Sequence, residues 1–125
     1  MIVFVDAHAL LWWLDDAATL SPPARRTIAD PANDILVSAA SVWEIAAKQA
    51  AGRLTGSSDL LTEIEAAQFA TVPFTATDAV IAANLPRHHG DPFDRMLIAQ
   101  AQRLDALIIS RDRAFAAYDV HVLAA

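Results

Sequence analysis

Four acidic side chains stand where an alternating strand–helix fold would bring them together, and together they could hold a hard divalent cation. They are Asp6, Glu44, Asp94 and Asp112. Carboxylates a few ångströms apart raise one another's pKa or repel one another. The commonest reason for such a cluster is a cation such as Mg²⁺, which prefers oxygen ligands. A cation held in this way can activate water and stabilise developing negative charge.

Three of these acids also have structural explanations when each is taken alone. Asp6 precedes an expected helix and can cap it, and Asp112 can be a cap or a turn residue. Asp94 falls in the first turn of an expected helix, where the helix dipole favours an acid. The joint arrangement is harder to explain in this way, because separate segments carry their acids to one edge of one sheet.

The fourth acid and a nearby aspartate carry similar alternatives. Glu44 can pair with Lys48 one helical turn later, which contributes a few tenths of a kcal/mol. The turn around Glu44 is apolar, however, and a buried acid needs a partner. Asp91 directly precedes Pro92, a strong capping arrangement, so we assign it to the cap first and to the site second.

Other polar and aromatic residues keep two interpretations. His8 can orient Asp6 or be a packing residue, and Ser110 can add a hydroxyl to the site or form a local turn. His88 and His89 can contact a substrate or belong to a solvated loop. Tryptophans within apolar helices favour packing in the core or between subunits over stacking on bases: Trp12, Trp13 and Trp43.

The elements that must position the acids follow from the hydrophobic pattern. Strands are expected at 2–5, 35–37, 71–72, 106–109 and 120–122. Helices are expected at 7–14, 22–29, 39–51, from Ser58 or Asp59 to about Phe69, 77–85, 93–104 and 113–117, with a turn at 56–58. Alternating strands and helices predict an α/β fold, a three-layer α/β/α sandwich with a central, mostly parallel sheet. Ligands bind such sheets at the carboxyl ends of the strands.

Composition sets further limits. The 125 residues predict one domain, residues 1–125, and the absence of cysteine excludes disulfides and thiolate metal sites. We expect neither a signal peptide nor a membrane span, since no apolar run approaches roughly 20 residues, and hence a cytoplasmic location. The net charge is −6, and two divalent cations at the acids would bring it to −2. A phosphate-bearing substrate is therefore compatible with this acidity, whereas strong non-specific DNA binding is not expected.

Four segments together resemble the PIN-domain ribonucleases, and most closely the VapC-type toxins of bacterial toxin–antitoxin systems. The segments are Asp6–Trp12 after its apolar strand, Ser38–Ile45, His88–Ala101 and Ile109–Asp112, in that order along the whole chain. The segment containing Asp91-Pro92-Phe93-Asp94-Arg95 is the most specific. Two positions depart from the family pattern: Ala7 stands where Thr or Ser is frequent, and Ser110 where Thr is common.

The resemblance implies a function. The family's acidic residues correspond to Asp6, Glu44, Asp94 and Asp112, which would bind Mg²⁺ or Mn²⁺ and catalyse cleavage of RNA. It also implies a homodimer and inhibition by a cognate VapB-like antitoxin. In this hypothesis one or two cations activate a water that attacks the phosphorus in line, and Arg95 or Lys48 could steady the acids or the phosphate.

Three other functions remain open at this point. A Mg²⁺-binding phosphoacceptor domain would place an accepting Asp after a middle strand and a Lys after a late one, but Ser38 follows 35–37 and no Lys follows Ile109. A catalytically inactive interaction module would bind its partner without binding a cation. A DNA nuclease differs from the ribonuclease only in its substrate, and the RNA assignment comes from the resemblance.

Overall fold

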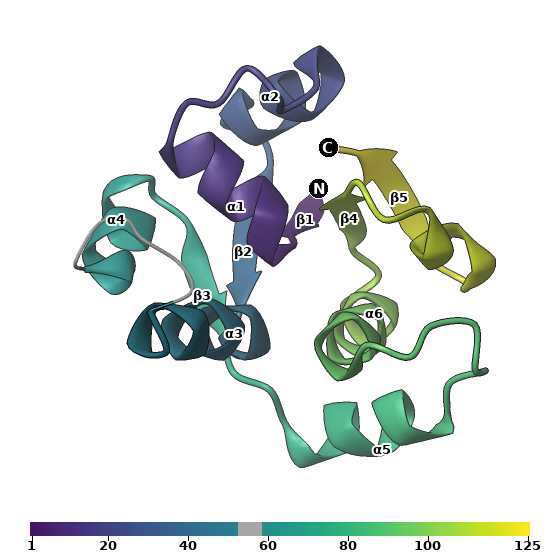
Figure 1. The fold of residues 1–125 in the computed structure, drawn as a ribbon. Coiled ribbons are helices and arrows are strands. Elements are labelled where there is room, and N and C mark those ends of the chain that lie inside the picture. The colour runs from purple at the N-terminus through teal and green to yellow at the C-terminus, as the bar shows by residue number, and fades with distance from the viewer. Residues whose placement is uncertain (53–58) are drawn as a thin grey trace.

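The structure, a computed structural model, describes residues 1–52 and 59–125, and in this part of the chain five strands form one sheet. Figure 1 shows the sheet between two sets of helices. The strands are β1 (Ile2–Val5), β2 (Asp34–Ser38), β3 (Ala70–Val72), β4 (Leu107–Ser110) and β5 (His121–Ala124). The helices are α1 (Ala7–Leu14), α2 (Pro22–Ala29), α3 (Ala39–Ala50), α4 (Leu60–Ala66), α5 (Ala76–Asn84), α6 (Pro92–Leu104) and the 3₁₀ helix η1 (Arg113–Ala117).

The order of the strands creates a natural ligand position. The order is β3-β2-β1-β4-β5, and every neighbouring pair is parallel. From β1 the chain continues outward to β2 and β3 on one side and returns to β4 and β5 on the other. The carboxyl ends of β1 and β4 therefore flank the point where the order reverses, which is where open α/β sheets bind ligands.

Alternate residues of the central strands pack into two separate hydrophobic cores, one on each side of the sheet. Val3 and Val5 pack on one side of the sheet with Leu10 of α1 and Ile28 of α2. Phe4, between them in sequence, packs on the other side in the core that includes residues of α6 and η1. This alternation follows from the two-residue period of a strand. It explains why β1 is apolar throughout, and it confirms the predicted three-layer α/β/α sandwich.

Two predicted elements differ most from the structure in their boundaries, and the others agree to within one residue at each end. The helix expected to reach about Phe69 ends at Ala66, because Gln68 adopts a left-handed conformation (φ 64°) that turns Phe69 into the core. The last strand lies at 121–124 rather than 120–122, after a turn in which the Val120 N–H donates to the Tyr118 carbonyl. The expected turn at 56–58 and the alternative cap Ser58 lie outside the described residues.

No helix within residues 1–52 and 59–125 is long and apolar enough to cross a membrane.

A buried ion pair joins α5 and α6, the helix that carries Asp94. The Asp78 side chain of α5 is fully buried and accepts hydrogen bonds from the Arg103 guanidinium of α6. Asp78 also accepts from the Thr75 N–H, which completes a capping box at the start of α5. Burial alone would raise the pKa of Asp78, but hydrogen bonds from Arg103 and Thr75 outweigh it and hold the pKa below its ordinary value.

Replacing this acid, Asp78→Asn, is expected to lower the free energy of unfolding at pH 7 by roughly 2 kcal/mol, through the lost charged hydrogen bonds and the weakened cap. Because the folded-state pKa is depressed, the contribution of the charge is full above the ordinary value of 3.8 and is lost as the pH falls through the folded-state value. Urea unfolding at pH 7 and pH 3 measures both effects. The exposed Asp119→Asn is the control, and equal stability of Asp78→Asn and wild type at pH 7 would contradict this account.

Candidate metal centre

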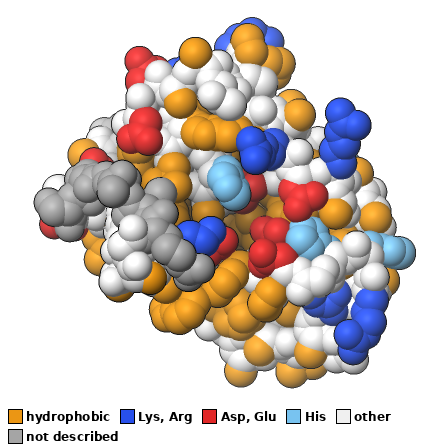
Figure 2. Space-filling view, viewed as in Figure 1, with side chains coloured by type: hydrophobic (Ala, Val, Ile, Leu, Met, Phe, Trp, Pro, Cys, Tyr) orange, Lys and Arg blue, Asp and Glu red, His pale blue; other side chains and the backbone are white. Residues whose placement is uncertain are grey.

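An acidic cavity of about 420 Å³ opens at the carboxyl edge of the sheet, and all four acids singled out in the sequence line it. Figure 2 shows acidic side chains gathered in a hollow on this face, beside histidine and basic side chains. The segments that carry the acids are separated by tens of residues along the chain. The complete lining is Asp6, Ala7, His8, Glu44, Asp91, Asp94, Arg111, Asp112 and Arg113.

Asp6 lies deepest in the cavity. It directly follows β1 and caps α1, where its Oδ1 accepts the Ala9 N–H at 2.8 Å. Only 6% of the residue is exposed. Burial raises the pKa of Asp6, and hydrogen bonds from Ser110 and the Ala9 N–H offset this only in part. Ser110 also accepts the Asp112 N–H at 3.0 Å, so its hydroxyl forms the predicted local turn beside Asp6. The Asp6 carboxylate retains a cost of desolvation that a cation would relieve.

Glu44 reaches the cavity from α3. This helix begins directly where β2 ends, because the buried Ser38 terminates the strand and caps the helix through the Ala40 N–H at 3.1 Å. Glu44 therefore sits in the second turn, close to the sheet edge. Lys48 pairs with Glu44 Oε2 at 3.2 Å, as the helical spacing predicted. The Glu44 side chain is 15% exposed, so the pair lies at the wall of the cavity rather than in open solvent.

Asp94 stands in the first turn of α6. That helix is capped by Asp91, whose Oδ1 accepts the N–H groups of Phe93 and Asp94 at 2.8 and 3.2 Å, as predicted. Burial, followed by repulsion from Asp91, raises the pKa of Asp94 to about 7, and the charges of Asp6 and Glu44 add to the effect. The charge of His89 lowers the pKa of Asp94 but offsets these effects only in part.

Asp112 lies nearer the rim and differs from the other acids. Its Oδ1 caps η1 by accepting the Ala114 N–H at 2.9 Å, and its side chain is 41% exposed. The hydrogen bond from Ala114 outweighs burial, and with a contribution from His89 it holds the pKa of Asp112 below its ordinary value.

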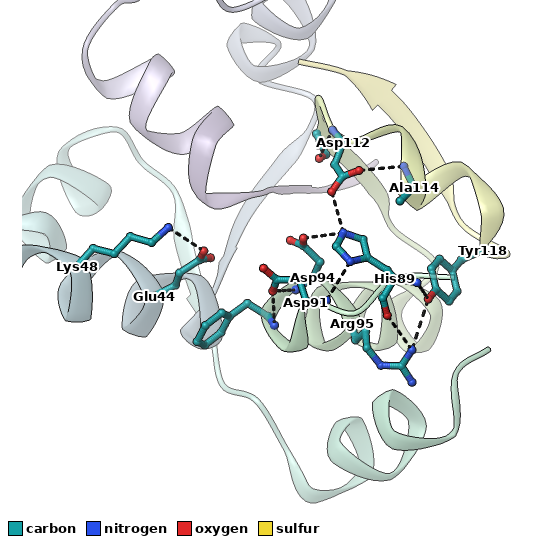
Figure 3. Close-up of polar contacts among 11 residues, drawn as sticks. Glu44, Lys48, His89, Asp91, Asp94, Arg95, Asp112, Ala114 and Tyr118 are labelled. Atoms are coloured by element: carbon teal, nitrogen blue, oxygen red, sulfur yellow. Dashed lines mark hydrogen bonds and ion pairs between the residues drawn. The ribbon is translucent and has the colours of Figure 1, made fainter. Parts of the chain in front are cut away.

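His89, whose role the sequence left undecided, lies between Asp94 and Asp112. Its Nε2 lies 2.9 Å from Asp94 Oδ2 and 2.7 Å from Asp112 Oδ2, as Figure 3 shows. Ligand atoms of these three residues fall within 4.8 Å of one another. His88, its neighbour, remains exposed and packs edge-on against Tyr118. In the sequence, the only signal for this role is that His89 stands two positions before Asp91, the residue that caps α6.

Arg95 does not contact the acids, contrary to the expectation that it could steady them. Its guanidinium donates to the carbonyls of Ala82 and Leu85 at 2.8 and 2.9 Å, and to those of Pro86 and His89 at 3.0 and 3.3 Å. Figure 3 shows it on the far side of His89 from Asp94 and Asp112. Arg95 therefore holds the α5–α6 loop in place behind the cavity.

Basic side chains border the acids at the mouth of the cavity. Arg111 and Arg113 flank Asp112 in the lining, and the Arg111 guanidinium lies 5.2 Å from the ring centroid of Trp12. His8 is exposed at the same mouth, and its electrostatic interaction with Asp6 lowers the pKa of that acid. Negative charge at the base and positive charge at the rim form a surface that could receive both a cation and a phosphate.

The donor set fits a hard divalent cation. The four acids and Asp91 provide only carboxylate oxygens, which are the ligands of Mg²⁺ and Mn²⁺. Asp6 is nearly fully buried, and no described Lys or Arg side chain makes an ion pair with it. A buried carboxylate without such a partner is costly unless a cation compensates it. Asp6, Glu44, Asp94 and Asp112 could therefore supply carboxylate ligands from the cavity wall. Among the described residues, the group whose ligand atoms lie within 4.8 Å of one another is His89, Asp94 and Asp112.

Comparison with known proteins gives a consistent family and fold. The chain matches the sequence profile of the PIN domain over residues 3–120. No curated protein sequence is significantly similar to it.

Several solved structures share its architecture over nearly the full chain. VapBC2 from Rickettsia felis, bound to a DNA fragment from their promoter, gives a TM-score of 0.73 at 10% identity over 98% of both chains. DNA-bound VapBC from Salmonella typhimurium gives 0.67 at 12% identity, over 98% of this chain and 97% of the other. A toxin–antitoxin complex from Klebsiella pneumoniae gives 0.66 at 16% identity, over 98% and 96%. At such identities the likeness concerns the fold, and it agrees with the predicted PIN-like sandwich.

Neutralising the central acid, Asp94→Asn, is expected to stabilise the cation-free protein. A folded-state pKa of about 7 against an ordinary 3.8 means that ionisation of Asp94 costs stability as the pH rises between these values and costs most above 7. We expect a gain on the order of 2 kcal/mol at pH 8 and a smaller gain at pH 5. Urea unfolding in EDTA measures it, with Asp119→Asn as the control. A variant less stable than wild type at pH 8 would contradict the electrostatic account.

Proposed function

Because the chain belongs to the PIN domain family, we propose that it is a metal-dependent endoribonuclease and the toxin of a toxin–antitoxin pair. The observation that carries the proposal is the convergence of Asp6, Glu44, Asp94 and Asp112 on one cavity. Four carboxylates from four separate segments, with the pKa values of Asp6 and Asp94 raised, are an unfavourable arrangement in the absence of a cation.

In this proposal each acid has a defined part. Asp6, Glu44 and Asp94 hold Mg²⁺ or Mn²⁺, and Asp112 supports them from the rim. When bound, the ion supplies Lewis-acid chemistry: it favours ionisation of water and neutralises charge on the phosphate. The protein holds the Asp6 carboxylate through the Ala9 N–H, and His89 Nε2 lies 2.9 Å from Asp94 Oδ2, so these carboxylates need little reorganisation when a cation binds.

The basic rim provides for the substrate. Arg111 and Arg113 are exposed and border the acids, so they are placed to bind backbone phosphates on either side of the scissile bond. The net charge of −6 limits long-range attraction of nucleic acid, which favours recognition at the cavity over general binding.

The fold likeness supports the proposed protein partner. The solved structures include VapBC complexes and a toxin–antitoxin complex, which this chain resembles over almost its whole length. We propose that a VapB-like antitoxin binds this chain and inhibits it.

A second copy of the chain is the other proposed partner. An apolar groove of about 660 Å³, with Trp43, Phe74, Phe93 and Met96 in its lining, lies beside the acidic cavity. Trp43 is 62% exposed and stacks on Phe93 with 5.3 Å between ring centroids. Large exposed aromatic surface of this kind favours burial against a partner, and we assign the apolar groove to the homodimer contact.

Removing the deepest acid, Asp6→Asn, is expected to abolish cleavage while the fold is retained. Asn keeps the shape and can still accept the Ala9 N–H, but it lacks the charge that binds the cation. The measurement is cleavage of total tRNA and rRNA with Mg²⁺ or Mn²⁺, with circular dichroism to confirm folding. EDTA should abolish wild-type cleavage, and Asp119→Asn should cleave normally. Full activity in folded Asp6→Asn would refute the assignment.

Titration with Mn²⁺ separates the nuclease from an inactive interaction module. Wild-type protein should bind the ion in calorimetry and Asp6→Asn should bind it far more weakly, because a buried carboxylate ligand is lost. Absence of binding by the wild-type protein would favour the interaction module.

Replacing the exposed tryptophan of the apolar groove, Trp43→Lys, is expected to convert a dimer to a monomer in sedimentation analysis, because a charge cannot be buried at that contact without cost. Leu61→Lys on α4 is the matched control, since Leu61 is similarly exposed (58%) but is not part of the groove. A dimer that persists in Trp43→Lys would place the contact elsewhere.

A further inference from the structure

His89 has a geometry that neither the sequence nor the proposed function explains. It lies in the loop between α5 and α6, and only 13% of its side chain is exposed. Its Nε2 faces Asp94 Oδ2 and Asp112 Oδ2 at 2.9 and 2.7 Å (Figure 3). With two carboxylates so close, this nitrogen would at first be taken for a metal ligand.

The other ring nitrogen argues against that role. The Asp91 N–H donates to His89 Nδ1 at 3.0 Å, so Nδ1 acts as an acceptor and carries no hydrogen. The hydrogen of the imidazole is then on Nε2, which donates to Asp112 Oδ2 and lies 2.9 Å from Asp94 Oδ2. A nitrogen that binds a cation must offer its lone pair, and Nε2–H has none to offer.

The backbone of His89 is fixed as firmly as its ring. Its N–H donates to the Tyr118 hydroxyl at 2.8 Å, and that hydroxyl donates to the Pro86 carbonyl at 2.8 Å. Arg95 donates to the His89 carbonyl at 3.3 Å. His89 is thus held through its N–H, its carbonyl and Nδ1, so little conformational entropy remains to be lost when Nε2–H holds the acids.

Asp94 and Asp112 differ in how many of their carboxylate oxygens are already engaged. Asp112 has both oxygens engaged, Oδ1 by the Ala114 N–H and Oδ2 by His89. Asp94 Oδ2 lies 2.9 Å from His89 Nε2, and no described residue donates to Asp94 Oδ1. Asp94 can therefore offer one oriented oxygen to a cation, while Asp112 is placed to act on Asp94 through the imidazole.

We propose that His89 is a positioning residue: its Nε2–H orients Asp94 for cation binding and links Asp112 to it, and His89 itself does not bind the cation. This inference rests on the proposed function, because it assigns His89 and Asp112 their parts in the same metal site. It predicts that Asp112 contributes to cation affinity mainly through His89.

The first test uses the cation-free protein and is independent of any activity. ¹⁵N NMR of the imidazoles should show Nδ1 of His89 unprotonated and Nε2 protonated. The same spectra of Asp91→Pro, which lacks the donating N–H, should show this tautomer preference weakened, with circular dichroism to confirm the fold. A hydrogen on Nδ1 in the wild-type protein would overturn the proposal.

The second test measures Mn²⁺ affinity by calorimetry in His89→Ala and His89→Gln. Loss of a group that orients a ligand typically costs about 10- to 100-fold in metal affinity, so we expect a loss in this range for His89→Ala. His89→Gln, whose amide can still donate, should recover most of it. The exposed neighbour is the matched control, and His88→Gln should bind Mn²⁺ like wild type.

Coupling and spectroscopy decide between positioning and ligation. The losses in His89→Ala and Asp112→Asn should not add in the double variant, because both act through one contact. Pulsed EPR of bound Mn²⁺ should show no directly coordinated nitrogen. A coordinated nitrogen that disappears in His89→Ala, or wild-type affinity in that variant, would overturn this inference alone. Failure of wild-type protein to bind Mn²⁺ would overturn the proposed function and this inference together.

Discussion

Negative charge gathered at one edge of a parallel sheet is the constraint on which this structure depends. The strands all run in one direction, so β1 and β4 end side by side, and the acids that follow them cannot be separated without a change of topology. Burial raises the pKa of Asp6 and, with the neighbouring acids, that of Asp94. The fold thus accepts an electrostatic cost in the region where the two halves of the strand order meet, and a cation is the group that removes this cost most directly.

Helix capping is how the chain keeps these charges in place. Asp6, Asp91 and Asp112 each accept backbone N–H groups at the start of a helix, where the helix dipole also favours an anion. The same hydrogen bonds begin a helix and orient a carboxylate at the cavity. Capping and site chemistry are therefore not alternatives at these positions, although each residue taken alone suggests that one must be chosen.

The sequence predicted the elements well because their signals are local. The apolar run before Asp6 and the Asp91-Pro92 cap identify β1 and the start of α6 from their own residues. The roles of His89 and Arg95 could not be predicted in this way, since they depend on Tyr118 and on carbonyls of α5 and its following loop, which only the folded chain brings near. The end of α4 was wrong for a related reason: Gln68 adopts a left-handed conformation so that Phe69 can join a core built from distant strands.

The strand order also has a consequence for the chain during its synthesis. β1, β2 and β3 lie next to one another and are translated first, together with Asp6 after β1 and with α3, which carries Glu44. The second edge of β1 stays unpaired until β4 emerges from the ribosome, and Asp94 and Asp112 arrive only with α6 and the turn after β4. An unpaired central strand is open to association with other chains. During translation, the edge of β1 that later pairs with β4 is therefore the position where a nascent chain of this order could pair with another chain before its carboxylates assemble.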